Sequence, residues 1–404
     1  MAETRVDLIV VGGGLTGLTL AIACAGAGIA VTVVDREDPA TMLEEPFDGR
    51  TTAIAYGSQR VLDGIGLWPL VADKAEPIRE IRVADDGSPL FLHYDHRDLG
   101  EAPLGYIVEN RVLRRELMTR ARSLPSLTHL APAAVVSVER AAATACATLG
   151  DGRVLKGELV AACDGRQSPL RHDAGIKRVA WDYPQRSIVC TVEHALPHRG
   201  IAVEHFLPAG PFAILPMTGN RSSIVWTERA ELVPALMALP APAFAAELRR
   251  RFGDFLGEIS VVGPRWSYSL SLMHAARYAA ARLVLVGDAA HVIHPIAGQG
   301  LNLGIRDIAA LAELIVDARR LGLDIAHPEF LERYEHWRRF DNLTLAAVTD
   351  GLNRLFSNSL PPLRAMREFG LATVNRLPPL KRVLMQHAMG LVGDLPRLAR
   401  GDAL

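Results

Sequence analysis

The sequence predicts an α/β fold: a discontinuous parallel-sheet domain, an inserted antiparallel β-sheet and C-terminal helices. Three observations predict it. A glycine-rich loop lies between two apolar strands near the N-terminus, and two further strand-loop-helix segments follow at Leu159–Arg171 and Arg282–Leu321. Between those two segments, short strands alternate with proline and glycine, which is typical of antiparallel sheets. The domain of parallel strands must therefore be interrupted by the antiparallel one.

The N-terminal segment carries a dinucleotide-binding fingerprint in its usual context. Its predicted elements are a strand, a glycine-rich loop, a helix and a second strand: Val6–Val11, Gly12–Gly17, Leu15–Ala27 and Ile29–Val34. In such a unit Gly12 makes the turn, Gly14 lets a pyrophosphate approach the backbone, and Gly17 lets the helix pack closely. Asp35 ends the second strand, where an acid binds ribose hydroxyls. This segment predicts a Rossmann-like domain.

Composition argues against several classes of partner and site. The 404 residues have a net charge of -1, so no basic surface predicts a nucleic-acid partner. The four cysteines are scattered, with neither metal-ligand spacing nor a disulfide framework, which indicates a reducing compartment. Residues 8–34 carry no charge, but their glycines interrupt any continuous apolar helix, so neither a signal peptide nor a membrane span is predicted. We expect a cytoplasmic protein without a metal site.

The second strand-loop-helix segment combines an apolar run with a sharp turn. Leu159–Ala162 is strand-like, and Asp164-Gly165 turns the chain. Ser168 before Pro169 is a favourable helix N-cap with proline at the first helical position. Two interpretations stay open: a cofactor-binding turn, or a structural turn followed by a solvated arginine, Arg171.

The third segment is the most informative one. Arg282–Val286 is a predicted buried strand, Asp288 follows its carboxyl end, and Pro295 with two glycines bends the chain before a helix over Leu301–Leu321. Backbone amides at a helix N-terminus carry a partial positive charge. Such an end suits a ligand that becomes anionic during reaction, as a reduced flavin ring does.

The remaining chain supplies the inserted sheet and the C-terminal region. Strands are predicted at Ser187–Val192, Ala202–Phe206, Ala213–Leu215 and Ser222–Trp226, with a hairpin over Ile78–Leu92 turning near residues 85–88. The predicted parallel-sheet domain then comprises residues 1–72, 101–180 and 264–325, and the inserted sheet comprises 73–100 and 181–263. Residues 326–404 form a helical region. A sheet in this position would cover the ligand and form a substrate pocket at the domain junction.

Taken together, these motifs resemble the single-component flavoprotein aromatic hydroxylases, over roughly residues 5 to 400. The block His294–Asp307 looks like the signature of the ubiquinone-biosynthesis ring hydroxylases. The resemblance implies a fold like that of p-hydroxybenzoate hydroxylase, with an FAD-binding domain and a substrate-binding sheet. No cysteine or histidine near these motifs stands in a known attachment motif, so we expect FAD to be bound noncovalently.

The resemblance assigns cofactor contacts residue by residue. Gly12, Gly14 and Gly17 would hold the FAD pyrophosphate. Contacts to the adenosine, the phosphates and the flavin would come from further residues: Asp35, Arg36, Arg50, Arg111, Val135, Asp164 (also for transient NAD(P)H), Asp288 (for the ribityl chain), Gly298, Gln299, Gly300, Leu301 and Asn302. Asp35 stands where many relatives have glutamate, which leaves the geometry of the ribose contact open.

The chemistry implied is aromatic-ring hydroxylation. No second glycine fingerprint is present, so NAD(P)H would visit the flavin site as a transient co-substrate. In this class of enzyme reduced FAD reacts with dioxygen to give a flavin hydroperoxide, which attacks an electron-rich ring. Two residues are candidates for catalysis: the Pro295 carbonyl, directed toward the substrate hydroxyl, and His294, assisting loss of the phenolic proton. A structural His294, bonded to backbone, is the alternative.

Three functions stay open. The first is monooxygenation of a polyprenylated phenol in ubiquinone biosynthesis, the second is hydroxylation of a small soluble aromatic compound, and the third is a non-catalytic scaffold in a quinone-biosynthesis assembly. The tract Phe206–Met217 either lines an apolar channel for a prenyl tail or is core strand. Leu384–Leu398 has helical apolar spacing between basic residues and either contacts a membrane surface peripherally or packs on the cofactor domain. Association with other quinone-biosynthesis proteins is a further expectation.

Overall fold

The computed structural model describes residues 3–44, 49–85, 91–357, 370 and 373–404. Its parallel sheet contains, in spatial order, β19 (Ala279–Ala280), β20 (Leu283–Leu285), β13 (Leu159–Ala162), β2 (Leu8–Val11), β3 (Val31–Val34) and β9 (Leu127–Leu130). All of these strands except β19 run parallel. The strands β20, β13 and β3 are buried along their whole length because the sheet lies inside one large apolar core, which explains their continuous apolar runs.

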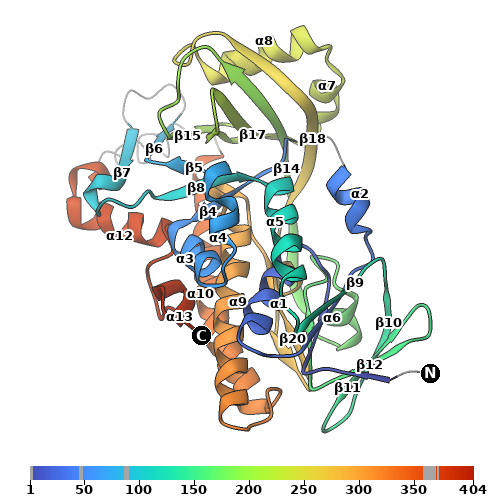
Figure 1. Cartoon of the computed structure of the whole chain (residues 1–404). Helices are drawn as coiled ribbons and strands as arrows, with labels where there is room; N and C mark the ends of the chain where they lie inside the picture. The colour runs from blue at the N-terminus through green and yellow to red at the C-terminus, as the bar shows by residue number, and fades with distance from the viewer. Residues whose placement is uncertain (1–2, 45–48, 86–90, 358–369, 371–372) are drawn as a thin grey trace.

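Two helices pack against each other beside this sheet and lie side by side in Figure 1: α1 (Leu15–Gly26) and α9 (Gly300–Arg320). A small sheet flanks it, formed by β1 (Glu3–Arg5), β12 (Val154–Gly157), β11 (Ala145–Leu149) and β10 (Val135–Arg140). The helix α5 (Asn110–Arg122) also packs on α1. The predicted N-terminal βαβ unit and the helix over Leu301–Leu321 are confirmed to within a few residues, because strong local patterns specify them.

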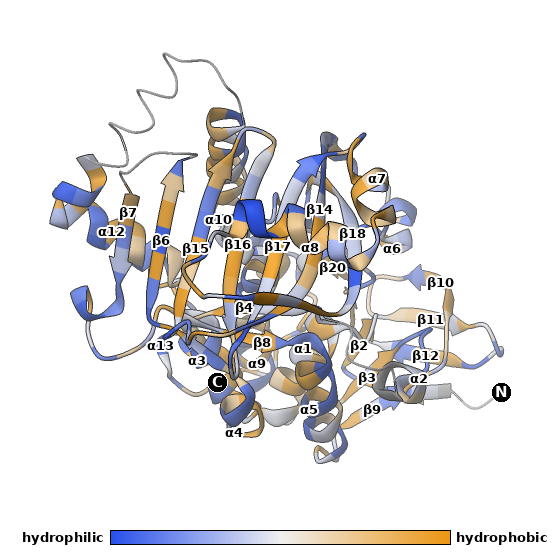
Figure 2. Cartoon of the chain, turned by 90° about the horizontal axis from the view of Figure 1, so that it is seen from above, coloured by the Kyte–Doolittle hydropathy of each residue, from blue (hydrophilic) through white to orange (hydrophobic). Residues whose placement is uncertain are grey.

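The second large sheet is mostly antiparallel and has eight strands. Its order is β21 (His291–Val292), β18 (Ile259–Ala275), β14 (Arg178–His194), β17 (Arg221–Arg229), β16 (Gly210–Met217), β15 (Ile201–Leu207), β6 (Glu80–Asp85) and β7 (Phe91–Asp95). Figure 2 shows β7, β6, β15, β16 and β17 side by side in this order. The four predicted strands and the hairpin are therefore confirmed, whereas the hairpin turn at residues 86–90 lies outside the described residues.

The helices α7 (Val233–Ala238) and α8 (Ala241–Phe252) cover one face of this sheet, at the top of Figure 1. The other face is turned toward the three-stranded sheet of β4 (Thr51–Ala55), β8 (Gly105–Glu109) and β5 (Glu76–Ile78). The tract Phe206–Met217 is divided between the two faces: Phe212 and Ile214 belong to the core under α8, and Phe206 and Met217 point the opposite way.

The strand β18 was not predicted, and β14 is longer than predicted. Both run for 17 residues and pair with each other along most of their length, so the expected domain boundaries at 180/181 and 263/264 fall inside strands. Much of β18 is exposed and interrupted by Gly263-Pro264, so its sequence lacks a regular alternation. Pairing with β14, distant in sequence, therefore decides this element.

The C-terminal region is helical, as predicted. It contains α10 (Pro328–Phe356), α12 (Pro378–Ala388) and the short α13 (Arg397–Arg400). The apolar spacing over Leu384–Leu398 does not form one helix, because α12 ends at Ala388 and Gly390 adopts a positive φ of 76°. Within the described residues, none of the helices combines the length and apolar character needed to cross a bilayer.

Candidate active site

Three chain segments meet where β2, β13 and β20 end. The strands are parallel neighbours, so the loops after them lie at one edge of the sheet. Gly12 has a φ of 101°, and a Cβ there would collide with the Cys163 carbonyl group. A Cβ at Gly17 would collide with the Gly12 carbonyl oxygen. The turn and the close helix packing predicted for these two glycines are therefore confirmed.

Asp35 anchors the glycine loop through two backbone hydrogen bonds. The Gly13 N–H donates to its Oδ2 at 2.9 Å, and the Glu37 N–H donates to its Oδ1 at 3.1 Å. The neighbouring Ala133 N–H donates to the Asp35 carbonyl at 2.6 Å, which places Val135, at the start of β10, close by in the chain. Arg36 is exposed beside this edge.

Arg50 and Arg111 are brought together by the pairing of β4 with β8. The Asn110 N–H donates to the Arg50 carbonyl at 2.9 Å, and the Arg50 guanidinium lies 5.6 Å from the centre of the Trp266 ring. Arg111 pairs with Glu109 at 2.6 Å. It borders a cavity of about 310 Å³ whose other lining residues are Asp73, Lys74, Glu109, Val112, Arg115 and Thr218. The fold thus brings together two predicted site residues, both basic, that lie 61 positions apart in the sequence.

Two carboxylates stand at the ends of β13 and β20. The Leu170 N–H donates to Asp164 Oδ2 at 3.2 Å, whereas Oδ1 is buried and has no partner among the described residues. Burial removes water from both carboxyl groups and raises the pKa of Asp164 and of Asp288. The nearby Arg171 is buried and donates to the Ala289 carbonyl at 2.7 Å, so it links the second and third segments and is not a solvated side chain.

The N-terminus of α9 lies next to β4. The Asn302 amide accepts the Ala55 N–H at 2.8 Å and donates to the Ala53 carbonyl at 2.9 Å, so this side chain holds the helix against β4. The predicted contact of Asn302 with the flavin stays a prediction. No described side chain caps α9, and its first turn includes Gly300 and Leu301 with unpaired N–H groups. Gln299 precedes the helix directly.

These features fit a bound dinucleotide. A Cβ at Gly14 would meet nothing within 4 Å, so space remains above the glycine loop, and the same holds at Gly300. Asp164 Oδ1, which has no partner among the described residues, can accept a hydrogen bond from a hydroxyl group of the ligand. The uncapped N-terminus of α9 can donate its N–H groups to an anionic ring. The glycine loop and Asp35 would hold the adenosine and phosphates of FAD, and Asp288 with residues 298–302 would hold its ribityl and ring portions.

A buried ionic network lies beneath this loop and was not predicted as part of the site. Asp307 is fully buried and accepts from His291 Nε2 at 2.6 Å, Arg338 Nε at 2.9 Å and the Gly287 N–H at 3.2 Å. His291 and Arg338 favour the charged form and hold the pKa of Asp307 down at about 2, although burial opposes them. An acid on the inner, apolar side of α9 is the only sequence signal of this network.

His294 and Pro295 form the bend before α9. Both nitrogens of the fully buried His294 ring lack a hydrogen-bond partner among the described residues. The ring contacts Tyr183 edge-on with 5.0 Å between centroids, and the Tyr183 hydroxyl donates to Asp350 at 2.7 Å. The Pro295 carbonyl accepts the Gly298 N–H at 2.9 Å, which leaves one lone pair for another donor. The structure therefore gives no backbone bond that would explain His294 as a structural residue.

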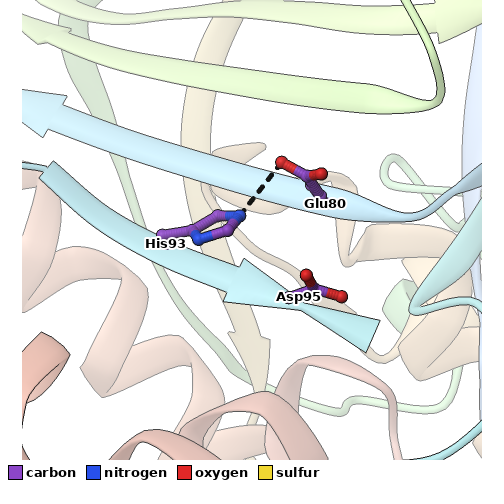
Figure 3. A group of neighbouring side chains, drawn as sticks. All are labelled: Glu80, His93 and Asp95. Atoms are coloured by element: carbon purple, nitrogen blue, oxygen red, sulfur yellow. Dashed lines mark hydrogen bonds and ion pairs between the residues drawn. The ribbon is translucent and has the colours of Figure 1, made fainter. Parts of the chain in front are cut away.

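A metal-like cluster lies elsewhere, on the edge strands β6 and β7. Figure 3 shows Glu80, His93 and Asp95, whose candidate ligand atoms lie within 4.8 Å of one another. Glu80 already pairs with Arg82 at 2.8 Å, and Asp95 pairs with Arg97 at 2.6 Å. These arginines neutralise both carboxylates, so the cluster is a set of surface ion pairs.

Comparison with known proteins identifies the family. A family model described as an FAD binding domain matches residues 5–341. The chain belongs to this family. The ubiquinone hydroxylase UbiL of Rhodospirillum rubrum is 54% identical, covering 100% of this chain and 94% of that protein. The 3-demethoxyubiquinol 3-hydroxylase of Escherichia coli is 34% identical, covering 97% and 100%. The solved p-nitrophenol 4-monooxygenase PnpA of Pseudomonas putida DLL-E4 shares the fold, with a TM-score of 0.81 at 21% identity over 97% and 99%.

Membership confirms the predicted cofactor and reaction class. The chain is an FAD-dependent monooxygenase, and NAD(P)H is the co-substrate typical of the family. The family match covers the glycine loop, both carboxylates at the strand ends and α9, so all of these features lie within the FAD-binding domain. The roles of individual side chains stay predictions.

Proposed function

We propose that this protein hydroxylates the ring of a polyprenylated phenol in ubiquinone biosynthesis, using FAD, NAD(P)H and dioxygen. The observation that carries the proposal is its similarity to ubiquinone hydroxylases along the whole chain. When bound, FAD takes electrons from NAD(P)H and activates dioxygen for transfer of one oxygen atom to the substrate. The other oxygen atom leaves as water.

The chain's own residues bind and orient the substrate. Burial lowers the pKa of His294 to about 4, so the imidazole is neutral at pH 7 and a free ring nitrogen accepts a hydrogen bond from the phenolic hydroxyl. The Pro295 carbonyl, one residue along the chain, keeps a lone pair that can accept a second hydrogen bond from the substrate. Tyr183 packs against His294 and helps to exclude water from it.

An apolar cluster next to this loop suits a prenyl tail. Ile296, the residue after Pro295, shares a buried cluster with Leu92, Phe206 and Phe356. The Phe206 and Phe356 rings are stacked with centroids 4.1 Å apart. The cluster joins the bend to the edge of the large sheet and to the end of α10, which supports an apolar path leading away from the ring site.

The substrate class is tested with phenols that differ only in their tail. Each methylene group buried in an apolar path adds up to about 0.8 kcal/mol, so the concentration of phenol needed to stimulate NAD(P)H oxidation should fall steeply from phenol to ortho-geranylphenol. Product and consumed NAD(P)H are measured together. An equal response to both phenols, or a stronger response to 4-hydroxybenzoate, would favour the soluble-aromatic alternative. No stimulated oxidation by any phenol would favour the scaffold.

We also propose a peripheral membrane contact through α12. Its outward side carries Leu380, Val383 and Leu384, which are 42%, 47% and 36% exposed, with Arg382 beside them. The sequence nearer the C-terminus packs instead on the FAD domain: Arg397 pairs with Glu313 and Asp317 on α9. The proposed membrane contact thus belongs to α12, and the packing on the FAD domain belongs to the segment around Arg397.

The membrane contact is tested by sedimentation with vesicles containing anionic lipid. Exchanging both Leu380 and Val383 for Asp should reduce the vesicle-bound fraction about tenfold or more, because each buried side chain contributes about 1.5 to 3 kcal/mol. The matched control is Leu321→Asp, which changes an equally apolar, 71% exposed side chain at the far end of α9. Equal sedimentation of all three proteins contradicts the contact.

A further inference from the structure

A carboxyl group stands alone on the site-facing side of the large sheet. Glu204 lies in β15 between Ala202 and Phe206, which point to the same face because side chains alternate along a strand. Its other neighbour, Val203, belongs to the core under α8. Glu204 therefore points away from that core and toward the FAD domain.

The two residues that flank Glu204 place it opposite the bend. Phe206 shares a buried cluster with Ile296, the residue after Pro295. Ala202 belongs to the cluster that includes Ala53. Ala53 lies close to the bend, because a Cβ added at Gly298 would be 3.0 Å from the Ala53 Cβ. Glu204 thus occupies the stretch of β15 that faces the loop from Pro295 to Gly298.

The row of side chains across the sheet at this level is otherwise apolar. Glu204 pairs in register with Ala213 on one side and Val83 on the other, and the row continues to Val225 and Leu92. No basic residue occurs in it. Among the described residues no donor and no cation accompanies the Glu204 carboxylate, and desolvation alone raises its pKa to about 7.

Glu204 is half-buried, so water or a ligand can reach its carboxyl group although no side chain of its row pairs with it. It can accept a hydrogen bond from a ring hydroxyl group of a bound phenol. By contrast, above about pH 8, where Glu204 is ionised, it repels a ring that carries a carboxylate, because like charges in a low-dielectric site repel each other strongly. The same group would therefore attract one substrate class and reject the other.

We propose that Glu204 determines specificity at this site, binding the ring hydroxyl of an uncharged phenol and excluding aromatic carboxylates. This rests on the proposed function, because it places the substrate ring between β15 and the bend at Pro295. It assigns the discrimination between a polyprenylated phenol and a soluble aromatic acid to one side chain.

The test compares a matched pair of ligands, ortho-geranylphenol and its para-carboxylate derivative, on the FAD-loaded protein. Their dissociation constants are measured at about pH 8.5, where Glu204 is ionised, from the change in flavin absorbance. The native protein should prefer the uncharged phenol by about tenfold or more. Glu204→Gln keeps the shape and a carbonyl acceptor but removes the charge, so binding of the acid should improve about tenfold while binding of the phenol changes little. Glu204→Leu should weaken binding of the phenol as well, because the acceptor is lost.

The control is Glu193→Gln, the same change at an exposed position of β14 in the same sheet. FAD content and thermal midpoint are recorded for every variant, so a folding defect is recognised. An unchanged ratio of the two dissociation constants in Glu204→Gln overturns the proposal, even when the protein hydroxylates neither ligand. Conversely, a shifted ratio without turnover supports Glu204 and rejects the proposed reaction.

Discussion

Replacing His294 by alanine should lower product formation by about 10²- to 10⁴-fold while FAD stays bound. The reason lies in the surroundings of the ring: both nitrogens are buried without a described partner, and the imidazole is neutral at pH 7 because burial lowers its pKa to about 4. The variant loses an acceptor for the phenolic hydrogen, but no protein group loses a partner. Flavin reduction by NAD(P)H should therefore continue, and the electrons should appear as hydrogen peroxide.

Two measurements on one preparation decide this prediction: FAD occupancy and the ratio of hydroxylated product to peroxide. The control is His172→Ala, which removes a histidine whose side chain is 91% exposed. If His294→Ala keeps the native ratio with full FAD, the residue has no part in the reaction. If FAD and folding are lost together, the structural interpretation of His294 holds instead.

Asp307→Asn should destabilise the protein by about 3 to 5 kcal/mol, since it removes the buried charge that pairs with His291 and Arg338. Arg338 keeps only its pair with the less buried Asp341. The Gly287 N–H also loses a charged acceptor. Since Gly287 precedes Asp288, FAD affinity should fall with stability. The free energy of unfolding is measured by denaturant titration of the apoprotein and the FAD content by absorbance.

The pH dependence gives this prediction a second readout. The folded pKa of Asp307, about 2, lies below its ordinary value of 3.8. Its stabilising contribution is therefore complete above about pH 4 and is lost as the pH falls toward 2. The stability difference between the native protein and Asp307→Asn should shrink over that window. Glu332→Gln, at an exposed position of α10, is the control, and a constant difference across the window would contradict the role of the charge.

The loops at the ends of β2 and β13 were largely predictable from the sequence. Gly12, Gly17 and Asp35 act within one βαβ unit, and Ser168 caps a helix by accepting the Arg171 N–H at 3.0 Å. Each of these features depends on residues close in the chain, whose backbone conformation follows from local sterics and hydrogen bonds. Local patterns therefore located the cofactor segments before their spatial arrangement was known.

The tertiary structure decided which distant groups meet. Asp307 and Arg338 are 31 positions apart, and no local pattern pairs them. Glu204 reads as an ordinary strand residue until the neighbouring strands show that its row is apolar and faces the bend. Likewise, β18 becomes a long strand only by pairing with β14. The sequence alone thus determined the cofactor class and the elements with strong local patterns. Burial and charge pairing depend on what the folded chain places around a residue, so the fold determined the long paired strands and the chemistry of the individual side chains.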